Sequence, residues 1–492
     1  YFEVSTVVES LHDALQFAIT EDESIFIIER LGAVKLFDPK VGVPITIHQL
    51  DIANSNSEYG ALGIVLDPDF AKNNLLYLYF HNKDTLKNQV SQFTFSDNKI
   101  NNEKLIIDFD VTRTSHHGGG IYFGNDRMLY ISSGDTTVHN QSNGYGPIDE
   151  RPNKATNDAQ RSSGNTNDLR GSILRIIVNE DGTYNIPKGN LFPPGNPKAR
   201  PEIYVMGCRN PFRIYVDKKT NTLYWGDVGP DARADGARGK QGHDEFNIAP
   251  KAGFYGWPYH NGYHYYNDYN FETNKIGAPF SDPIINDSPN NTGLNELPPV
   301  VAPALAYNYG KSKQFPLLGQ GSRNAMAGPV IHQEGLEHNF PAYFDGKPMF
   351  YDWARQKIFM LHVDENNKCQ EIEPFLSSIK FTQPIDIKMG PKGDLYILNY
   401  GSVWYGNKDS YIIKVRYGGE NRRPIAKAST NVDVGSAPLQ VNFSSEGSLD
   451  KDGDAITYTW NFGDGNISNK INPSHLYSSP GIYNANLTIK DS

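Results

Sequence analysis

Cysteines and long hydrophobic runs are scarce in this chain of 492 residues. Its 2 cysteines, Cys208 and Cys369, exclude a disulfide framework and a four-cysteine zinc site, while a single bond between them stays open. No Cys-x-x-Cys-His motif is present for attachment of a c-type haem. No apolar run reaches the roughly 20 residues that a membrane-spanning helix needs, so we expect no membrane span.

Clustered positive charge is also lacking. Lys and Arg together number 46 against 56 Asp and Glu, a net charge of −10, and no block of like charges occurs. Because nucleic acids and anionic membranes require clustered Lys and Arg, we expect neither as a partner. The chain starts at Tyr1 without a signal-peptide pattern, and we interpret it as a processed or trimmed product.

Residues that favour strands and turns are abundant. The chain has 45 Gly, 31 Pro, 29 Tyr and 25 Phe. Short strand–turn–strand patterns recur six times, beginning near residues 17, 63, 120, 212, 328 and 385. Repeated units of about four short strands predict an all-β chain with a six-bladed β-propeller over 1–420. The same strand signals also suit an array of β-sandwiches.

Polar inserts interrupt these units at about 136–168, 229–250 and 258–325. Inserts on one face of a propeller commonly build a binding site. The aromatic run 257–266 could stack on sugar rings, or it could be an ordered loop without a ligand.

The composition changes near residue 423. Alternating strand patterns follow over 424–492, with Trp460 in a central one. About seventy residues of this kind predict a small immunoglobulin-like β-sandwich.

A possible acid–base pair lies near the third unit. His116 precedes a run of three glycines, which allow a ligand to approach the backbone. An imidazole titrates near neutrality and can accept a hydroxyl proton. Asp135, at the end of the same hairpin, could hold this histidine in one tautomer. Loop histidines with capping roles are the simpler alternative.

Two further groups could bind an anion or a metal. Arg209 and Asn210 precede another strand, and a guanidinium beside an amide suits a carboxylate or a quinone oxygen. The loop 227–245 is rich in carboxylates and carbonyls, the ligands that Ca²⁺ prefers, although it lacks EF-hand spacing. A solvated or ion-paired role is the alternative for Arg209.

Taken together, these motifs resemble the soluble quinoprotein sugar dehydrogenases, the glucose/sorbosone dehydrogenase family of six-bladed propellers that use pyrroloquinoline quinone. The resemblance covers roughly residues 1–418. It is carried in family order by Glu58-Tyr-Gly-Ala-Leu-Gly63, Asp67-Pro-Asp-Phe70, His116-His-Gly-Gly119, Gly134-Asp135, Gly171-Ser-Ile-Leu-Arg175, Arg209-Asn-Pro211, Gly229-Pro230 and Gly256-Trp-Pro258. Residues 424–492 resemble a PKD domain through Tyr458-Thr-Trp-Asn-Phe-Gly-Asp-Gly465 and Asn472-Pro-Ser-His-Leu-Tyr477.

The resemblance implies a role for each matching residue. His116 would be the general base that takes the proton of a sugar hydroxyl, and Asp135 would orient it. Arg209 and Asn210 would hold the quinone oxygens, with Glu58 near the pocket. The carbonyls of Gly229 and Pro230 would bind a Ca²⁺ that also contacts the cofactor.

One stretch departs from the family pattern. Glucose-type members carry two arginines where this chain has 382–386, which contains none, and their cofactor-binding Lys falls next to Arg355. A tricarboxylate cofactor needs cationic partners, and Arg323 and Arg355 are the candidates to supply them.

The resemblance therefore predicts oxidation of a sugar or oligosaccharide hydroxyl, at the anomeric carbon, with quinone and Ca²⁺. Electrons would pass to an external acceptor such as a cytochrome or a haem domain. The family and the PKD-like unit imply a secreted, periplasmic or cell-surface location. The alternative is a non-redox, Ca²⁺-dependent propeller that binds glycans or hydrolyses a lactone or glycan; a third possibility is a surface interaction module.

Overall fold

The structure is a computed structural model that describes residues 2–52, 57–138, 141–332, 336–418, 423–451 and 453–491. Strands dominate the described residues, which confirms the prediction of an all-β chain. The chain divides into two compact units. One comprises Val4–Val330 and Lys347–Val415, and the other Tyr1–Glu3, Ile331–Gly346 and Arg416–Ser492. The propeller boundary predicted at residue 420 does not anticipate the grouping of 331–346 with the C-terminal residues.

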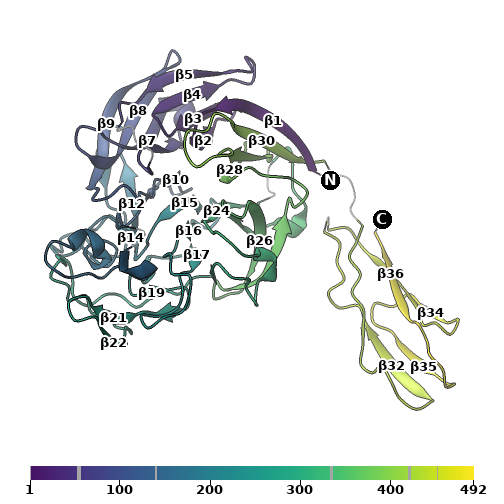
Figure 1. Ribbon diagram of the computed structural model, residues 1–492. Coiled ribbons are helices and arrows are strands. Elements are labelled where there is room, and N and C mark those ends of the chain that lie inside the picture. The colour runs from purple at the N-terminus through teal and green to yellow at the C-terminus, as the bar shows by residue number, and fades with distance from the viewer. Residues whose placement is uncertain are drawn as a thin grey trace. The chain divides into compact units, whose positions relative to one another are not determined.

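The described residues of the larger unit form six main sheets, which follow one another around a common centre (Figure 1). The first two are β2 (Ala14–Ile19), β3 (Ile25–Glu29), β4 (Ala33–Phe37) and β5 (Pro44–Gln49), then β6 (Ala61–Leu66), β7 (Leu75–His81), β8 (Lys87–Ser96) and β9 (Lys99–Asp110). The third is β10 (Ile121–Phe123), β11 (Leu129–Ser133), β12 (Ser172–Val178), β14 (Ile203–Met206) and β18 (Gly253–Phe254), with β13 (Tyr184–Asn185) beside β12.

The remaining three sheets complete the series. They are β15 (Pro211–Val216), β16 (Leu223–Asp227), β17 (Asp244–Ala249) and β23 (Leu305–Tyr307); β24 (Ala325–Val330), β25 (Pro348–Asp352), β26 (Lys357–Val363) and β27 (Cys369–Phe375); and β28 (Pro384–Met389), β29 (Leu395–Asn399) and β30 (Ser410–Tyr417) with β1 (Phe2–Leu11). The last sheet thus joins the N-terminal strand to the C-terminal strands of the unit.

The first strands of successive sheets contact one another in a closed series, from β2 through β6, β10, β15, β24 and β28 back to β2. This is a β-propeller-type arrangement. Apolar side chains fill the space between neighbouring sheets; Phe26, Leu76 and Phe80, for example, belong to one buried cluster. Near the centre, Arg213 donates from Nε to the Ile385 carbonyl at 3.0 Å and from Nη2 to that of Leu15 at 2.5 Å.

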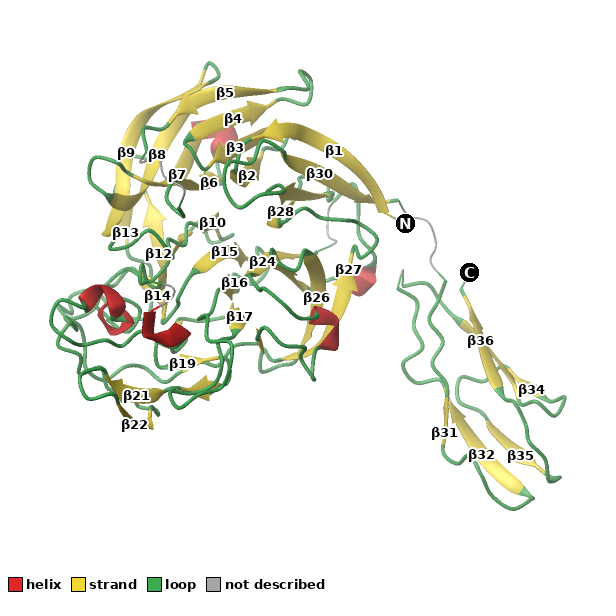
Figure 2. Cartoon of the chain, in the orientation of Figure 1, coloured by secondary structure: helices red, strands yellow, loops and turns green. Residues whose placement is uncertain are grey.

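Helices are short and lie in the connections (Figure 2). They are α1 (Phe70–Asn73), η1 (Gln141–Gly144), η2 (Ala155–Asn157), η3 (Ala159–Arg161), η4 (Pro316–Leu318) and η5 (Ala342–Phe344). Two small hairpins extend the third insert, β19 (His260–Asn261) with β20 (His264–Tyr265) and β21 (Asn267–Asn270) with β22 (Lys275–Pro279). No helix among the described residues combines the length and apolarity needed to cross a membrane.

The C-terminal residues form two three-stranded sheets. One is β31 (Ser429–Thr430), β32 (Leu439–Ser444) and β35 (Ser474–Tyr477), and the other β34 (Ile467–Ser468), β33 (Thr457–Asn461) and β36 (Asn486–Lys490). Trp460 is buried in a cluster with Phe443 and Phe462, and its Nε1 donates to the Ile471 carbonyl at 3.2 Å. Both sheets therefore share one small core.

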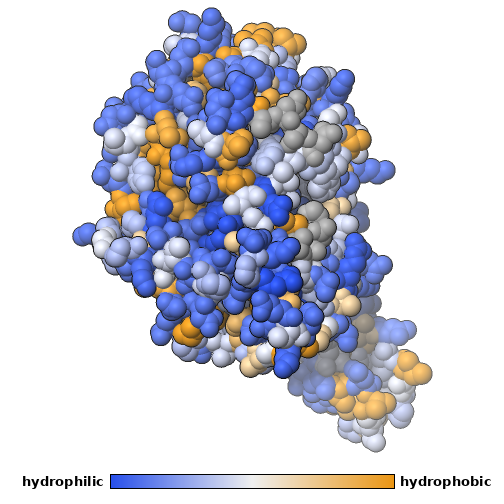
Figure 3. Space-filling model, turned by 60° about the vertical axis from the view of Figure 1, so that its left-hand side comes forward, coloured by the Kyte–Doolittle hydropathy of each residue, from blue (hydrophilic) through white to orange (hydrophobic). Residues whose placement is uncertain are grey.

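The protein surface in the view of Figure 3 is mostly hydrophilic, with separate small hydrophobic patches. Apolar residues scattered singly over the surface are usual in folded proteins.

Candidate active site

A cavity in the larger unit has a volume of about 540 Å³. Loops before the first strands of several sheets contribute to it, since His116 precedes β10, Arg209 precedes β15 and Arg323 precedes β24. Its lining comprises Leu15, Arg30, Ser57, Glu58, Leu62, Thr114, Ser115, His116, Arg209, Asn210, Phe212, Val228, Asp231, Arg323, Asn324, Met326, Trp353, Ile385, Tyr400, Trp404 and Tyr405. Residues far apart in the sequence thus meet at one end of the ring of strands.

His116 and Asp135 are directly bonded. His116 Nδ1 lies 2.7 Å from Asp135 Oδ1, which also accepts the Thr137 N–H at 2.8 Å. The second carboxylate oxygen accepts Trp257 Nε1 at 2.8 Å. With Nδ1–H donating to the carboxylate, Nε2 is the basic nitrogen of the neutral ring. The dyad can therefore accept a proton.

The environment of Asp135 keeps it ionised. Burial acts to raise the pKa of this carboxyl, but the charges of His116 and Arg209 and the Thr137 N–H outweigh it, so its pKa lies below the ordinary value. A fixed negative charge beside the imidazole stabilises the imidazolium that forms when His116 takes a proton.

The backbone around His116 is constrained. His116 has a φ of 58°, in the left-handed region that is uncommon for residues other than glycine. A Cβ on Gly134 would lie 2.0 Å from the His116 carbonyl oxygen, so the two loops need glycine to pass this closely. Glu58 Oε2 accepts the His116 N–H at 2.6 Å. The predicted residues Glu58, His116 and Asp135 therefore form one connected group.

Arg209 and Asn210 share an anchor. Their backbone N–H groups donate to the carboxylate of Asp227, at 2.9 and 2.7 Å respectively. Burial raises the pKa of Asp227 to about 7, although these two N–H groups act in the opposite direction. Asn210 Oδ1 accepts the Gly118 N–H at 3.0 Å, which ties this loop to that of His116.

The Arg209 guanidinium is held but still reaches the cavity. Nη1 donates to the Val228 carbonyl at 2.9 Å, and Nη2 lies 3.6 Å from Asp231 Oδ2. Its side chain is nearly buried, yet Arg209 remains among the lining residues. Such a guanidinium presents a positive charge to the cavity without needing to reorganise.

At the predicted calcium ligands, Pro230 is already engaged. Its carbonyl oxygen accepts Nη2 of Arg323, whose Nη1 is ion-paired with Asp244. The Gly229 N–H donates to Asp244 Oδ1 at 2.9 Å. Within the described ranges, no group of three or more His, Cys, Asp or Glu side chains is placed to hold a metal ion.

Arg355 is not among the residues that line the cavity. Its guanidinium donates to backbone carbonyls, among them Asn308 at 2.7 Å and Ser322 at 3.1 Å. It therefore ties down the loop before β24, whereas Arg323, the other predicted cofactor ligand, lies in the lining.

Some lining residues carry buried polar atoms that have no hydrogen-bond partner among the described residues. Arg323 Nε, Asn324 Oδ1 and Trp353 Nε1 are examples. Buried polar groups are nearly always paired in folded proteins. Their occurrence in one cavity wall indicates a polar occupant such as a ligand or water.

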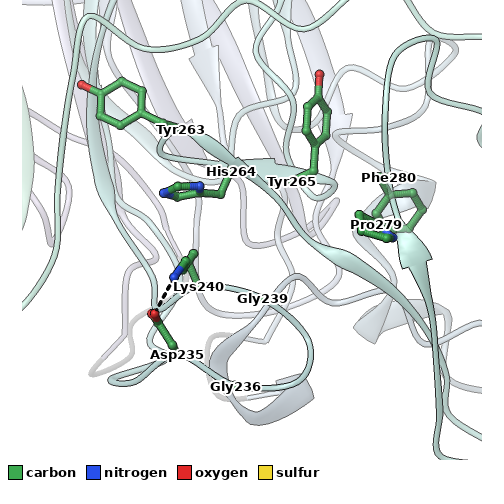
Figure 4. A pocket seen from close by; sticks show the side chains of 9 residues that line it. All are labelled: Asp235, Gly236, Gly239, Lys240, Tyr263, His264, Tyr265, Pro279 and Phe280. Atoms are coloured by element: carbon green, nitrogen blue, oxygen red, sulfur yellow. Dashed lines mark hydrogen bonds and ion pairs between the residues drawn. The ribbon is translucent and has the colours of Figure 1, made fainter.

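A second cavity, of about 470 Å³, lies in the inserts (Figure 4). In its wall, Lys240 Nζ is ion-paired with Asp235 Oδ2 at 2.8 Å, and His264 lies nearby. His116 and Arg209 are not among its lining residues, so the two cavities are separate.

Sequence reasoning assigned no site role to several lining residues. Among them are Arg30, Trp353 and Trp404, which come from three different sheets or their loops. Trp257, which the aromatic run suggested as a sugar-stacking residue, is instead buried against Asp135. The local sequence around Trp257, with a glycine before it and a proline after it, does not indicate a hydrogen-bond partner so far away in the chain.

Comparison with known proteins gives two family matches. The family model described as glucose/sorbosone dehydrogenase matches residues 11–293, and the model of a PKD domain matches residues 421–492.

Among curated relatives, an uncharacterized protein of Synechocystis sp. is 25% identical over 407 residues, covering 80% of this chain and 82% of that protein. Quinoprotein glucose dehydrogenase B of Acinetobacter calcoaceticus is 24% identical over 337 residues, 61% of this chain and 64% of that protein. The chain spans only 28% of the HIPL2 protein of Arabidopsis thaliana, with 26% identity over 243 residues.

Two solved structures share the fold. An oxidoreductase of Thermus thermophilus, described as a glucose dehydrogenase, superimposes with a TM-score of 0.58 at 22% identity, covering 84% of this chain and 100% of that one. The PQQ-bound aldose sugar dehydrogenase of Streptomyces coelicolor gives a TM-score of 0.54 at 17% identity, with 85% and 99% covered.

Proposed function

Because the chain belongs to the glucose/sorbosone dehydrogenase family, with a PKD domain at its C-terminal end, we propose that it is a quinoprotein dehydrogenase that oxidises a sugar hydroxyl. One observation carries the proposal. The bonded pair of His116 and Asp135 and the guanidiniums of Arg209 and Arg323 converge on a single cavity. A proton acceptor and fixed positive charges are what this reaction requires.

The cavity residues fit pyrroloquinoline quinone in size and charge. Its volume of about 540 Å³ is within the range of cofactor pockets, roughly 300–1,000 Å³. Arg209 and Arg323 would bind the carboxylates and quinone oxygens, and Asn210 would add an amide. Trp353 Nε1 and Arg323 Nε, which have no hydrogen-bond partner within the described part of the chain, are further donors. Trp353, Met326 and Phe212 supply apolar surface for a flat ring.

When bound, the quinone supplies the acceptor for a hydride from the sugar carbon. His116 Nε2 takes the hydroxyl proton as the C–H bond breaks and a carbonyl forms, giving a lactone if the anomeric carbon reacts. Asp135 stabilises the resulting imidazolium and keeps the ring oriented. Arg209 stabilises negative charge that develops in the cavity.

An external acceptor, for which a cytochrome or a haem domain is the candidate, would take up the two electrons, and the proton that arrived with the hydride would pass to water. His116 would release the hydroxyl proton to water, which restores the starting state. We propose the anomeric hydroxyl of a sugar or oligosaccharide as the substrate group, because the family resemblance implies it. The polar and aromatic side chains of the lining suit a sugar ring.

The calcium ion that the family implies does not fit the residues as they stand. The Pro230 carbonyl accepts the Arg323 guanidinium and so already has a cationic partner. No step of the mechanism is therefore assigned to Ca²⁺.

We further propose that the six sheets act as the blades of a six-bladed propeller over 1–420 and that 424–492 is an immunoglobulin-like PKD sandwich. The closed series of strand contacts and the single Trp460 core support these assignments. The PKD domain also favours an extracellular or periplasmic location.

Reconstitution tests the proposal. The purified protein is loaded with pyrroloquinoline quinone and screened against aldoses and oligosaccharides with a dye acceptor. We expect sugar-dependent dye reduction that His116→Ala abolishes, while His264→Ala, in the second cavity, retains it. Absence of both quinone binding and dye reduction would refute the proposal.

A non-redox glycan-binding or lactone-hydrolysing protein is the second candidate. The sequence of residues 382–386 favours this candidate, because it lacks the arginine pair with which glucose-type members bind their cofactor. Glycan binding without quinone, together with no redox turnover, would favour it.

A further inference from the structure

The guanidinium of Arg323 is fixed between two oxygen-bearing partners. Nη1 pairs with the fully buried Asp244, and Nη2 donates to the carbonyl of Pro230. The side chain of Arg323 is only 2% exposed. Its Cζ lies 4.2 Å from the centre of the Tyr309 ring, which supports one face of the guanidinium. A cation is thus already seated at this carbonyl.

The partners of Arg323 are themselves immobilised. Asp244 accepts the Gly229 N–H on Oδ1 and the Ala325 N–H on Oδ2, both at 2.9 Å. A Cβ on Gly242 would lie 1.7 Å from the Pro230 oxygen and 2.8 Å from Arg323 Nη2. The loop at 242 must therefore be glycine for the carbonyl and the guanidinium to meet. This packing indicates a built site for one particular cation.

The same arrangement disfavours a free divalent ion. A metal bound to the Pro230 carbonyl would share it with a guanidinium and meet a like charge at close range in a buried setting. Arg209 adds a second positive charge, because its Nη1 bonds to the neighbouring Val228 carbonyl. Oxygen ligands that already accept guanidinium protons are poor ligands for Ca²⁺, which needs six to eight oxygens.

We propose that Arg323 replaces the divalent cation of this site, so that its guanidinium, anchored by Asp244 and Pro230, is the cation that binds an anionic quinone in the cavity. The inference rests on the proposed function for the quinone, but its claim about calcium stands independently. Arg323 lines the cavity, and its Nε is buried without a partner among the described residues, as expected of a group that meets a ligand.

Calcium binding by the chain tests the claim directly, with Ca²⁺ alone as the probe. Equilibrium dialysis after EGTA treatment counts bound ions in the wild type, Arg323→Ala and Arg238→Ala. Arg238 is a matched control, because it is buried and donates to the carbonyls of Ser142 and Gly146 but lies outside the cavity. Removal of Arg323 exposes Asp244 and the Pro230 carbonyl to a cation.

We expect Arg323→Ala to bind one more Ca²⁺ per chain than the wild type and Arg238→Ala to bind no more than the wild type. Equal counts in the wild type and Arg323→Ala would overturn the inference. If Arg323→Ala does not fold, Arg323→Gln, which removes the charge but keeps polar atoms, takes its place with the same two outcomes.

Quinone affinity supplies the second readout. The wild type should bind pyrroloquinoline quinone with dissociation constants that agree within about twofold in EGTA and in Ca²⁺. Arg323→Lys, which keeps the charge but loses the planar fork, should bind about 10-fold more weakly. Quinone binding by the wild type that strengthens about 10-fold or more with Ca²⁺ would contradict the inference. Failure to bind quinone at all defeats the proposed function instead and leaves the calcium count as the test.

Discussion

His116 bonds through Nδ1 to Oδ1 of Asp135 at 2.7 Å, although the two residues come from opposite ends of the β10–β11 hairpin. The bond fixes the ring so that Nε2 is the nitrogen able to receive a proton. A buried carboxylate at this position is an orienting group as well as a counter-charge.

Replacement of His116 should separate chemistry from binding. We expect His116→Ala to lower kcat by about 10²–10⁴-fold, the usual contribution of general base catalysis, with the quinone dissociation constant nearly unchanged. Steady-state dye reduction and a quinone titration measure the two quantities. An equal loss of quinone binding would contradict the role assigned to His116.

Asp135→Asn should keep the shape of the site but disturb the orientation of His116. An amide cannot stabilise an imidazolium, so we expect kcat to fall by about 100-fold or more while KM changes little. The pH profile of kcat should also shift, which a purely structural role would not cause. A variant with wild-type kcat at every pH would rule out Asp135 as a positioning residue.

Arg209→Lys tests the guanidinium fork. Lysine keeps the positive charge but cannot donate to the Val228 carbonyl and a ligand in the same planar geometry. We expect the quinone to bind about 10-fold more weakly. The matched substitution Arg238→Lys, outside the cavity, should leave quinone affinity as in the wild type, and equal affinity in the two variants would count against direct contact by Arg209.

Stability should depend on pH through a buried carboxyl pair. Asp227 and Glu245 are partners across β16 and β17, and burial together with the Asp227 charge raises the pKa of Glu245 to about 8. A carboxyl with a raised pKa in the folded state binds a proton that the unfolded chain has released, so the stability it contributes is lost as pH rises from about 4.5 through 8.

We therefore expect the thermal unfolding midpoint of the larger unit in the wild type to decrease as the pH is raised from 5.5 to 8.5. Glu245→Gln, which is neutral at both pH values, should flatten this dependence. Calorimetric scans at the two pH values make the comparison, and an unchanged slope in the variant would show that Glu245 does not titrate in this range.

Much of the fold was predictable because its signals are local. Alternation of apolar and polar residues and turns such as that around Glu23, with a φ of 64°, mark each hairpin without knowledge of the rest of the chain. The residues of the dyad and Arg209 were predicted from short motifs that resemble a family. These signals repeat from sheet to sheet, which made the all-β architecture recognisable.

Long-range partnerships could not be predicted in this way. The Trp257 bond to Asp135 spans 122 positions and the Arg323 contact with Asp244 spans 79, and no spacing rule links such residues. Arg355 was expected to bind the cofactor, but its guanidinium bonds to loop carbonyls instead. Proximity in sequence to a family position does not determine where a side chain points. These long-range contacts form only when the ring of sheets closes and brings distant loops together.

Single-turnover reduction of bound quinone tests the central claim most directly. The quinone-loaded protein is mixed anaerobically with each aldose and oligosaccharide of a panel, and the absorbance of the quinone is followed. The account predicts that at least one sugar reduces one equivalent of quinone per wild-type chain and none in His116→Ala. Quinone that stays oxidised in the wild type with every sugar, or that is reduced equally in His116→Ala, would contradict it.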